Sequence, residues 1–242
     1  MKKLSVIIPV FNEKNTIFDV LLKVSAVELQ NGIEKEIIVV NDMSTDASKD
    51  EIERYLKAYP NSNIRLINHE INRGKGGALH TGIKYAEGDY TIIQDADLEL
   101  DPNEYKVLLH PVLNEGCDIV YGSRFLNQKR PNTSLSQLAN RFLTWLSNFV
   151  FNLKITDMET CYKLVPTKVF QSLILEEKRF GFEPEITAKL AKIKSLKWKE
   201  VPITYIPRTN LQGKKIGWKD GFRAIYCIIK YGWLTSLKAS VK

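Results

Sequence analysis

Two acidic residues separated by one position follow an apolar run near the middle of the chain. The run covers residues 90–94, and Asp95 and Asp97 come directly after it. In an extended segment, residues i and i+2 point to the same side, so the two carboxylates converge where a buried strand ends. Two like charges are costly there unless a cation lies between them. Because Mg²⁺ and Mn²⁺ take oxygen ligands, often carboxylates together with substrate phosphates, the pair predicts a metal-assisted site for a phosphorylated substrate.

Apolar runs of strand length alternate with helical patterns through the first half of the chain. Such an alternation predicts an α/β fold with a mostly parallel sheet and helices on both faces. The expected strands are 4–10, 36–41, 64–68, 90–94 and 118–122, and the expected helices are 16–29, 46–58, 75–87 and 103–114.

Polar residues follow four of the expected strands. Ligands of parallel sheets bind beyond the carboxyl ends of the strands, so these residues are expected to share one rim. They are Asn12 and Glu13 after the first strand, Asp42 after the second, Asp95 and Asp97 after the fourth, and Ser123 and Arg124 after the fifth.

A glycine-rich segment, residues 72–77, precedes the expected helix 75–87. Its glycines allow close backbone approach, and a helix N-terminus attracts anions. The segment matches neither the Walker loop nor the dinucleotide fingerprint. Taken alone, it is equally consistent with a flexible turn.

Composition narrows the class of protein. A chain of 242 residues with 44% hydrophobic and 26% charged residues is typical of a soluble globular protein with a sizeable core. The net charge of +7 favours anionic partners, namely nucleic acid, phosphorylated small molecules or an anionic membrane. Nucleic acid is disfavoured, because the basic residues form no single stripe and no nucleic-acid motif is present. The three widely spaced cysteines indicate reduced thiols in the cytosol.

Two segments in the second half are amphipathic. Residues 142–153 are too short to span a bilayer, which needs about 20 residues, but their apolar side chains follow helical spacing. Residues 218–233 mix basic side chains with aromatic and aliphatic ones. A core-facing helix would explain the first segment, yet both suit a membrane surface, which is the function we expect for them.

The order of the motifs resembles glycosyltransferase family 2, and within it the polyprenyl-phosphate glycosyltransferases of the dolichyl-phosphate mannose synthase and undecaprenyl-phosphate glucosyltransferase type. This resemblance implies a GT-A fold, a nucleotide-sugar donor, a divalent metal (Mg²⁺ or Mn²⁺) and inversion at the anomeric carbon. The segments that carry it are 6–13, 39–46, 72–76, 95–99, 122–124, 140–141, 156–163 and 208–216.

The resemblance also implies roles for the residues that bind the donor. Asp95 would face the ribose and the metal, and Asp97 and Glu99 would hold the metal against the diphosphate. Glu99 departs from the Gln that is common at this position. The base and ribose would be surrounded by Pro9, Phe11, Glu13 and Asp42, Lys75 would help to place the nucleotide, and Arg208, Lys214 and Lys215 would lie on a loop that closes over the diphosphate.

The acceptor chemistry depends on charge. A phosphate acceptor has a second pKa of about 6 and attacks without a strong base, whereas a hydroxyl requires one. Arg124 and Arg141 suit an acceptor phosphate, because guanidinium groups match phosphate oxygens. Asp157 is a candidate base or orienting group. Glu183 and Glu185 are interpreted as first-turn acids of a helix and stay outside the predicted site.

We therefore expect one catalytic domain, 1–242, with a nucleotide-binding half 1–124, an acceptor-binding half 125–217 and a C-terminal amphipathic membrane-surface helix 218–242. It would move mannose or glucose from a UDP- or GDP-hexose to a dolichyl or undecaprenyl phosphate. It would act peripherally at the cytoplasmic face of a membrane, alone or with a separate membrane protein. The alternatives are transfer to a lipid or glycan hydroxyl, a sugar-nucleotide pyrophosphorylase, and a non-catalytic nucleotide-binding protein.

Overall fold

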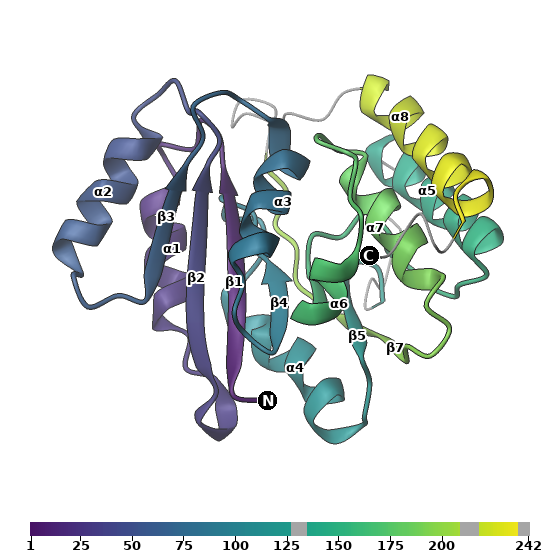
Figure 1. The fold of residues 1–242 in the computed structure, drawn as a ribbon, viewed down its shortest axis with the longest axis horizontal. Helices are drawn as coiled ribbons and strands as arrows, with labels where there is room; N and C mark the ends of the chain where they lie inside the picture. The colour runs from purple at the N-terminus through teal and green to yellow at the C-terminus, as the bar shows by residue number, and fades with distance from the viewer. Residues whose placement is uncertain (127–134, 209–217, 237–242) are drawn as a thin grey trace.

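A computed structural model describes residues 1–126, 135–208 and 218–236 (Figure 1). Its strands form one seven-stranded sheet in the order β3-β2-β1-β4-β6-β5-β7. The strands are β1 (Lys3–Val10), β2 (Glu34–Asn41), β3 (Ile64–Asn68), β4 (Tyr90–Ile93), β5 (Ile119–Ser123), β6 (Lys163–Pro166) and β7 (Trp198–Pro202).

The four strand pairings that do not involve β6 are all parallel, as the near-continuous apolar runs predict. β1 lies between β2 and β4, and its residues Leu4 to Ile8 are fully buried. β6 is antiparallel to both β4 and β5 and was not predicted, and neither was β7. Each of these two short strands contains at least one charged side chain and ends at a proline, so neither forms a clear apolar run.

Helices cover both faces of the sheet, which confirms the predicted α/β class. In Figure 1, α3 lies in front of the sheet and α1 lies behind it. The two helices cover opposite faces because α1 connects β1 to β2 and α3 connects β3 to β4, and these two crossings run in opposite directions along the sheet. The helices are α1 (Ile17–Ala26), α2 (Ser48–Ala58), α3 (Gly74–Tyr85), α4 (Tyr105–Asn114), α5 (Leu135–Phe151), α6 (Thr167–Ser172), α7 (Phe182–Ala191) and α8 (Trp218–Ile229), with a π-helical turn, η4 (Lys230–Leu234), after α8.

The second half of the chain is organised around α7. Every residue of this helix is buried, and α5 and α8 both pack against it. Buried charges are paired within and around α7. Lys189 Nζ lies 2.6 Å from Glu185 Oε1 within the helix, and Arg223 of α8 forms an ion pair of 2.7 Å with Glu177 in the segment before α7. None of the helices in the described ranges combines the length and apolar character that crossing a bilayer requires.

The rim at the carboxyl ends of β1 and β2 turns sharply. Asn12 and Met43 follow these strands with φ values of 53° and 57°, a left-handed conformation that is uncommon outside glycine. The Asn12 side chain joins the two turns, because its Oδ1 accepts a hydrogen bond of 2.8 Å from Thr45 N. These turns place Glu13 and Asp42 at the edge where β4 also ends, and both residues line the same cavity.

Candidate active site

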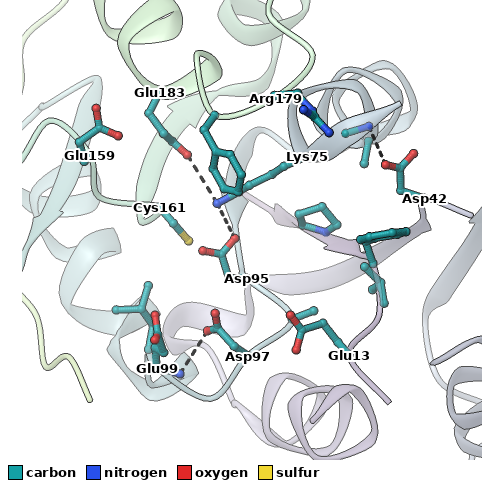
Figure 2. A pocket seen from close by; sticks show the side chains of 18 of the residues that line it. Glu13, Asp42, Lys75, Asp95, Asp97, Glu99, Glu159, Cys161, Arg179 and Glu183 are labelled. Atoms are coloured by element: carbon teal, nitrogen blue, oxygen red, sulfur yellow. Dashed lines mark hydrogen bonds and ion pairs between the residues drawn. The ribbon is translucent and has the colours of Figure 1, made fainter. Parts of the chain in front are cut away.

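A cavity of about 430 Å³ opens at the rim, between the two halves of the chain (Figure 2). Its lining contains most of the predicted site residues: Pro9, Phe11, Glu13, Asp42, Lys75, Asp95, Asp97, Glu99, Arg124 and Arg208. These residues come from segments spread over most of the chain, and the fold brings them together at one cavity.

The other predicted site residues lie elsewhere. Asp157 is fully buried and reaches the cavity only through Arg124. Arg141 is exposed on α5 and does not line the cavity. Lys214 and Lys215 fall in 209–217, outside the described residues.

Several cavity residues were not predicted. Glu183 was interpreted as a first-turn acid of a helix, whereas it lies in the cavity wall. The others include Asn72, Glu159, Cys161, Arg179, Tyr205 and Asp220. Three of these lie in segments that the family resemblance had marked, 72–76 and 156–163, without being assigned to the site, and the rest come from segments that gave no such signal.

Asp42 organises the start of α3. Its Oδ1 accepts a hydrogen bond from Arg73 N at 2.8 Å, and its Oδ2 accepts one from Gly74 N at 2.7 Å. His69 Nδ1 lies 2.7 Å from the same Oδ1, and the imidazole is itself held by Thr81. Asp42 therefore lines the cavity and also anchors the glycine-rich turn that carries Lys75.

The glycines of this turn accommodate the chain's own backbone. A Cβ atom at Gly76 would lie 2.2 Å from the Glu177 carbonyl oxygen, and one at Gly74 would lie 2.4 Å from that of Lys178. Gly74 also has a φ of 80°, which favours glycine. Gly77 N donates to Lys178 O at 3.0 Å, so the segment before α7 is docked on the start of α3.

Lys75 connects the acidic pair to the second half of the chain. Its Nζ lies 2.7 Å from Asp95 Oδ1 and 3.8 Å from Glu183 Oε1, as the dashed lines in Figure 2 show. Burial favours neutral Asp95, but the Lys75 ammonium outweighs it and lowers the pKa of this carboxyl. Asp95 is thus an ionised carboxylate held between the two halves.

Arg208 lies among the other carboxylates of the rim. Its Nη2 donates to Asp97 Oδ2 at 2.7 Å, its Nη1 donates to Glu13 Oε2 at 3.0 Å, and its backbone N donates to Glu99 Oε1 at 2.8 Å. Burial, with the charges of Asp95 and Glu99, nevertheless raises the pKa of Asp97 to about 7. One guanidinium therefore relieves only part of the repulsion at this rim.

The carboxylate oxygens of Asp95, Asp97 and Glu99 suit a hard divalent cation, because they are crowded enough to raise the pKa of Asp97. Within the described ranges, however, no three His, Cys, Asp or Glu side chains are arranged to hold a metal ion. The predicted set of Asp95, Asp97 and Glu99 is thus not a preformed three-ligand site, because Lys75 and Arg208 hold these carboxylates. Substrate phosphates would have to supply the remaining ligands.

Arg124 and Asp157 form a two-pronged ion pair behind the cavity. Arg124 Nε and Nη2 each lie 2.7 Å from a carboxylate oxygen of Asp157, and the backbone N of Arg124 donates to Asp157 as well. The guanidinium also lies over the Tyr205 ring, 5.2 Å from its centre. With both of its oxygens engaged, Asp157 is placed to orient Arg124 rather than to remove a proton from a substrate.

An apolar face runs along α5 and the π-helical turn η4 that follows α8. Trp145 and Phe149 are 60% and 70% exposed, and Phe149 meets Trp233 at a centre-to-centre distance of 6.4 Å. Phe142 extends this row of rings along α5. We call Phe142, Trp145, Phe149 and Trp233 the aromatic face. Patches of this kind typically mark an interaction surface.

This chain belongs to glycosyl transferase family 2, since residues 5–174 match the family of that description. The fold agrees with the GT-A fold that the sequence resemblance implies.

Three relatives align with most of this chain. The chain is 31% identical to the dolichyl-phosphate beta-glucosyltransferase of Dictyostelium discoideum over 88% of this chain and 68% of the relative. It is 28% identical to a dolichyl-phosphate beta-glucosyltransferase of Trichomonas vaginalis, with the same coverage. An uncharacterized protein of Methanocaldococcus jannaschii is 28% identical over 93% of this chain and 90% of its own length.

Solved structures support the fold. Glucosyl-3-phosphoglycerate synthase of Mycobacterium tuberculosis, crystallised with Mn²⁺, uridine diphosphate and phosphoglyceric acid, matches 97% of this chain and 80% of its own. The TM-score is 0.71 and the sequence identity is 17%. The same enzyme with Mg²⁺ and uridine diphosphate gives a TM-score of 0.68 at 17% identity.

Proposed function

We propose that this glycosyltransferase moves glucose from UDP-glucose to a polyprenyl phosphate, with inversion and with the help of Mg²⁺ or Mn²⁺. The observation that carries the proposal is the pairing of Arg208 with Asp97 and Glu13, which brings a guanidinium and two carboxylates together at one rim. The names of the Dictyostelium and Trichomonas relatives support the sugar and the acceptor, and the Mycobacterium complexes support the donor and the ion.

The donor would bind with its nucleotide in the first half of the chain. Pro9, Phe11 and Glu13 would line the base and ribose, and Asp97, with Asp95 beside it, would hold the ion against the diphosphate. The ion would stabilise the negative charge of the departing diphosphate.

Arg208 would act on the same negative charge. In the structure its guanidinium is shared between Asp97 and Glu13. A diphosphate offers stronger acceptors, so the guanidinium would turn toward it and stabilise the leaving group as the bond to the sugar breaks.

The acceptor phosphate would be held by Arg124. Asp157 engages Nε and Nη2 of this guanidinium, which leaves Nη1 for a phosphate oxygen. That oxygen would attack the anomeric carbon, and the bonding electrons would leave with the nucleoside diphosphate. An ionised phosphate needs no base, which is consistent with an orienting role for Asp157.

The acceptor would reach the site from a membrane surface. The aromatic face offers rings that insert at the boundary between headgroups and acyl chains. α8 connects this face to the cavity, because Asp220 near its start lines the cavity and Trp233 follows its end. The three free cysteines are consistent with a cytoplasmic location.

A transfer assay tests the proposal. Radiolabelled UDP-glucose, UDP-galactose and GDP-mannose would be offered with Mn²⁺ to a polyprenyl phosphate, a diacylglycerol and 3-phosphoglycerate. We expect product from UDP-glucose and the polyprenyl phosphate, and its loss on chelation or in Asp97→Asn. Product formed only from diacylglycerol or from phosphoglycerate would refute the lipid-phosphate acceptor.

A further inference from the structure

We propose that Glu183 and Glu159 form the subsite that binds the hydroxyl groups of the donor hexose. This inference rests on the proposed function and adds to it the residues that recognise the sugar. The subsite lies in the wall that the second half of the chain contributes to the cavity (Figure 2).

Glu183 is held rigidly with one oxygen unused. The residue is only 5% exposed, and its Oε2 forms an ion pair with Lys163, whose side chain is fully buried. Within the described part of the chain, Oε1 has no hydrogen-bond partner and faces the Lys75 ammonium at 3.8 Å. A buried carboxylate oxygen without a donor is costly, so its orientation toward a cavity points to a ligand that supplies one.

Glu159 lies in the same wall and also has an unused oxygen. Its Oε1 is buried and finds no hydrogen-bond donor among the residues that the structure describes. Figure 2 shows Glu159, Glu183 and Cys161 on one side of the cavity, opposite Glu13 and Asp42. Two buried acceptors beside one cavity match a ligand that carries several hydroxyl groups, as a hexose does.

The position agrees with the order of groups in a nucleotide sugar. Lys75 joins Asp95 to Glu183, so Glu183 lies just beyond the acidic pair as seen from the nucleotide residues Pro9 and Asp42. The hexose is attached to the distal phosphate of the donor. With the diphosphate at Asp97, the hexose would extend toward this wall.

Glu185 shows what a purely structural acid looks like on the same helix. It is fully buried, but its oxygens accept hydrogen bonds from Glu176 N and Glu177 N at 2.8 Å, and Lys189 pairs with it at 2.6 Å. Glu185 does not line the cavity. It therefore serves as a control with matched burial and charge.

Calorimetry with Mn²⁺ tests the subsite by comparing UDP-glucose with UDP, which lacks the hexose. We expect Glu183→Gln and Glu159→Gln each to weaken UDP-glucose binding about tenfold or more, as for one hydrogen bond to a charged group. UDP binding should change less than about twofold, and Glu185→Gln should leave the ratio of the two affinities as in the wild type.

UDP-glucose analogues that each lack one ring hydroxyl supply a second measurement. In the wild type, at least one analogue should bind about tenfold more weakly than UDP-glucose. In the glutamine variant that lacks the carboxylate contacting that hydroxyl, the same analogue and UDP-glucose should bind with equal affinity. If Glu183→Gln fails to fold, Glu159→Gln and the wild-type analogue series still decide the question.

Equal losses for UDP and UDP-glucose, or no loss for either, would overturn the subsite and leave the proposed transfer intact. A wild-type chain that binds no uridine nucleotide would refute both. Transfer of glucose that persists at wild-type affinity in both glutamine variants would refute the subsite alone.

Discussion

Arg208 and Asp97 form an ion pair of 2.7 Å across 111 positions of sequence. The backbone makes this possible, because Ile206 N donates to Glu99 O at 2.9 Å and Tyr205 bridges to Leu100. The segment that carries the arginine is thus docked beside the segment that follows β4. The site has a built-in cation that competes for the carboxylate we expect to hold the metal.

The first prediction concerns this competition. In Arg208→Ala, Mn²⁺ should bind several-fold more tightly without nucleotide, because Asp97 and Glu13 lose their paired cation. The kcat of transfer should nevertheless fall about 10²-fold, as when one group that stabilises a leaving anion is removed. Calorimetry and steady-state kinetics measure the two effects. Arg54→Ala, on α2, is the control, and an unchanged Mn²⁺ affinity in Arg208→Ala would show that the pair does not compete.

The second prediction concerns Asp157 and Arg124. Asp157→Asn leaves a guanidinium without its buried counter-charge and should lower the free energy of unfolding by about 3 kcal/mol. Because Asp157 acts through Arg124, the KM for the acceptor should rise similarly in Asp157→Asn and Arg124→Gln, and the double variant should be little worse than either. The pH dependence of kcat should keep its shape. Loss of the acid limb of that profile in Asp157→Asn would instead identify Asp157 as a base.

The third prediction concerns the glycine-rich turn. Gly76→Ala would place a Cβ atom 2.2 Å from the Glu177 carbonyl oxygen. The backbone of the segment before α7 would have to shift, which should cost about 1–3 kcal/mol of stability and lower activity with it. Gly221→Ala in α8 is the control, because among the described residues no atom beyond its chain neighbours and its own helix backbone lies within 4 Å of the added Cβ, and it should stabilise by about 0.5–1 kcal/mol. Equal melting temperatures for the two variants would contradict the packing argument.

The fourth prediction concerns the aromatic face. Replacing Trp145 and Phe149 together by serine should weaken sedimentation with anionic vesicles about tenfold or more, because burying each large apolar side chain contributes about 1.5–3 kcal/mol. Glucose transfer to a short, water-soluble phosphate acceptor should be unaffected. Val107→Ser, on the exposed side of α4, is the control. A double variant that still sediments but changes its oligomeric state would identify the face as a contact between copies.

The fifth prediction concerns pH. Burial, together with the charge of Glu183, raises the pKa of Glu159 from 4.5 to about 7. Between these values the folded chain binds more protons than the unfolded chain, so the free energy of unfolding falls as the pH rises through this window. Glu159→Gln should make that fall smaller. The free energy of unfolding of the variant, relative to that of the wild type, should therefore be higher at pH 8 than at pH 5. Urea unfolding at several pH values measures this, and parallel curves for the two proteins would contradict it.

Much of the first half was predictable because its signals are local. The strand Ile64–Asn68 was predicted with its exact bounds, and the ends of β1 and β2 fall where the apolar runs meet Asn12 and Asp42. Alternation of apolar strands with helices implies a parallel sheet, and a parallel sheet places the carboxyl ends of its strands on one rim. That logic predicted Glu13, Asp42, Asp95, Asp97 and Arg124 at the rim, whereas Pro9, Phe11, Lys75 and Glu99 were expected from the family resemblance.

The second half depends on contacts that no local pattern encodes. No local pattern predicted that both carboxylate oxygens of Asp157 would accept hydrogen bonds from Arg124. Glu183 and Glu185 both lie in the first turn of α7, so the sequence did not distinguish the cavity residue from the structural one. Arg141 lies on a helix whose exposed face is mostly apolar, away from the cavity.

The amino-acid sequence by itself thus determined the family, the first five strands of the sheet and the acidic residues at their ends, because periodicity and residue type act over a few neighbouring positions. Only the tertiary structure decided which charges meet. Arg208 reaches Asp97, Lys75 reaches both Asp95 and Glu183, and Gly76 makes room for the Glu177 backbone. Such pairings depend on how distant segments pack, and the energy of a charge depends on its burial and on the partner that packing gives it.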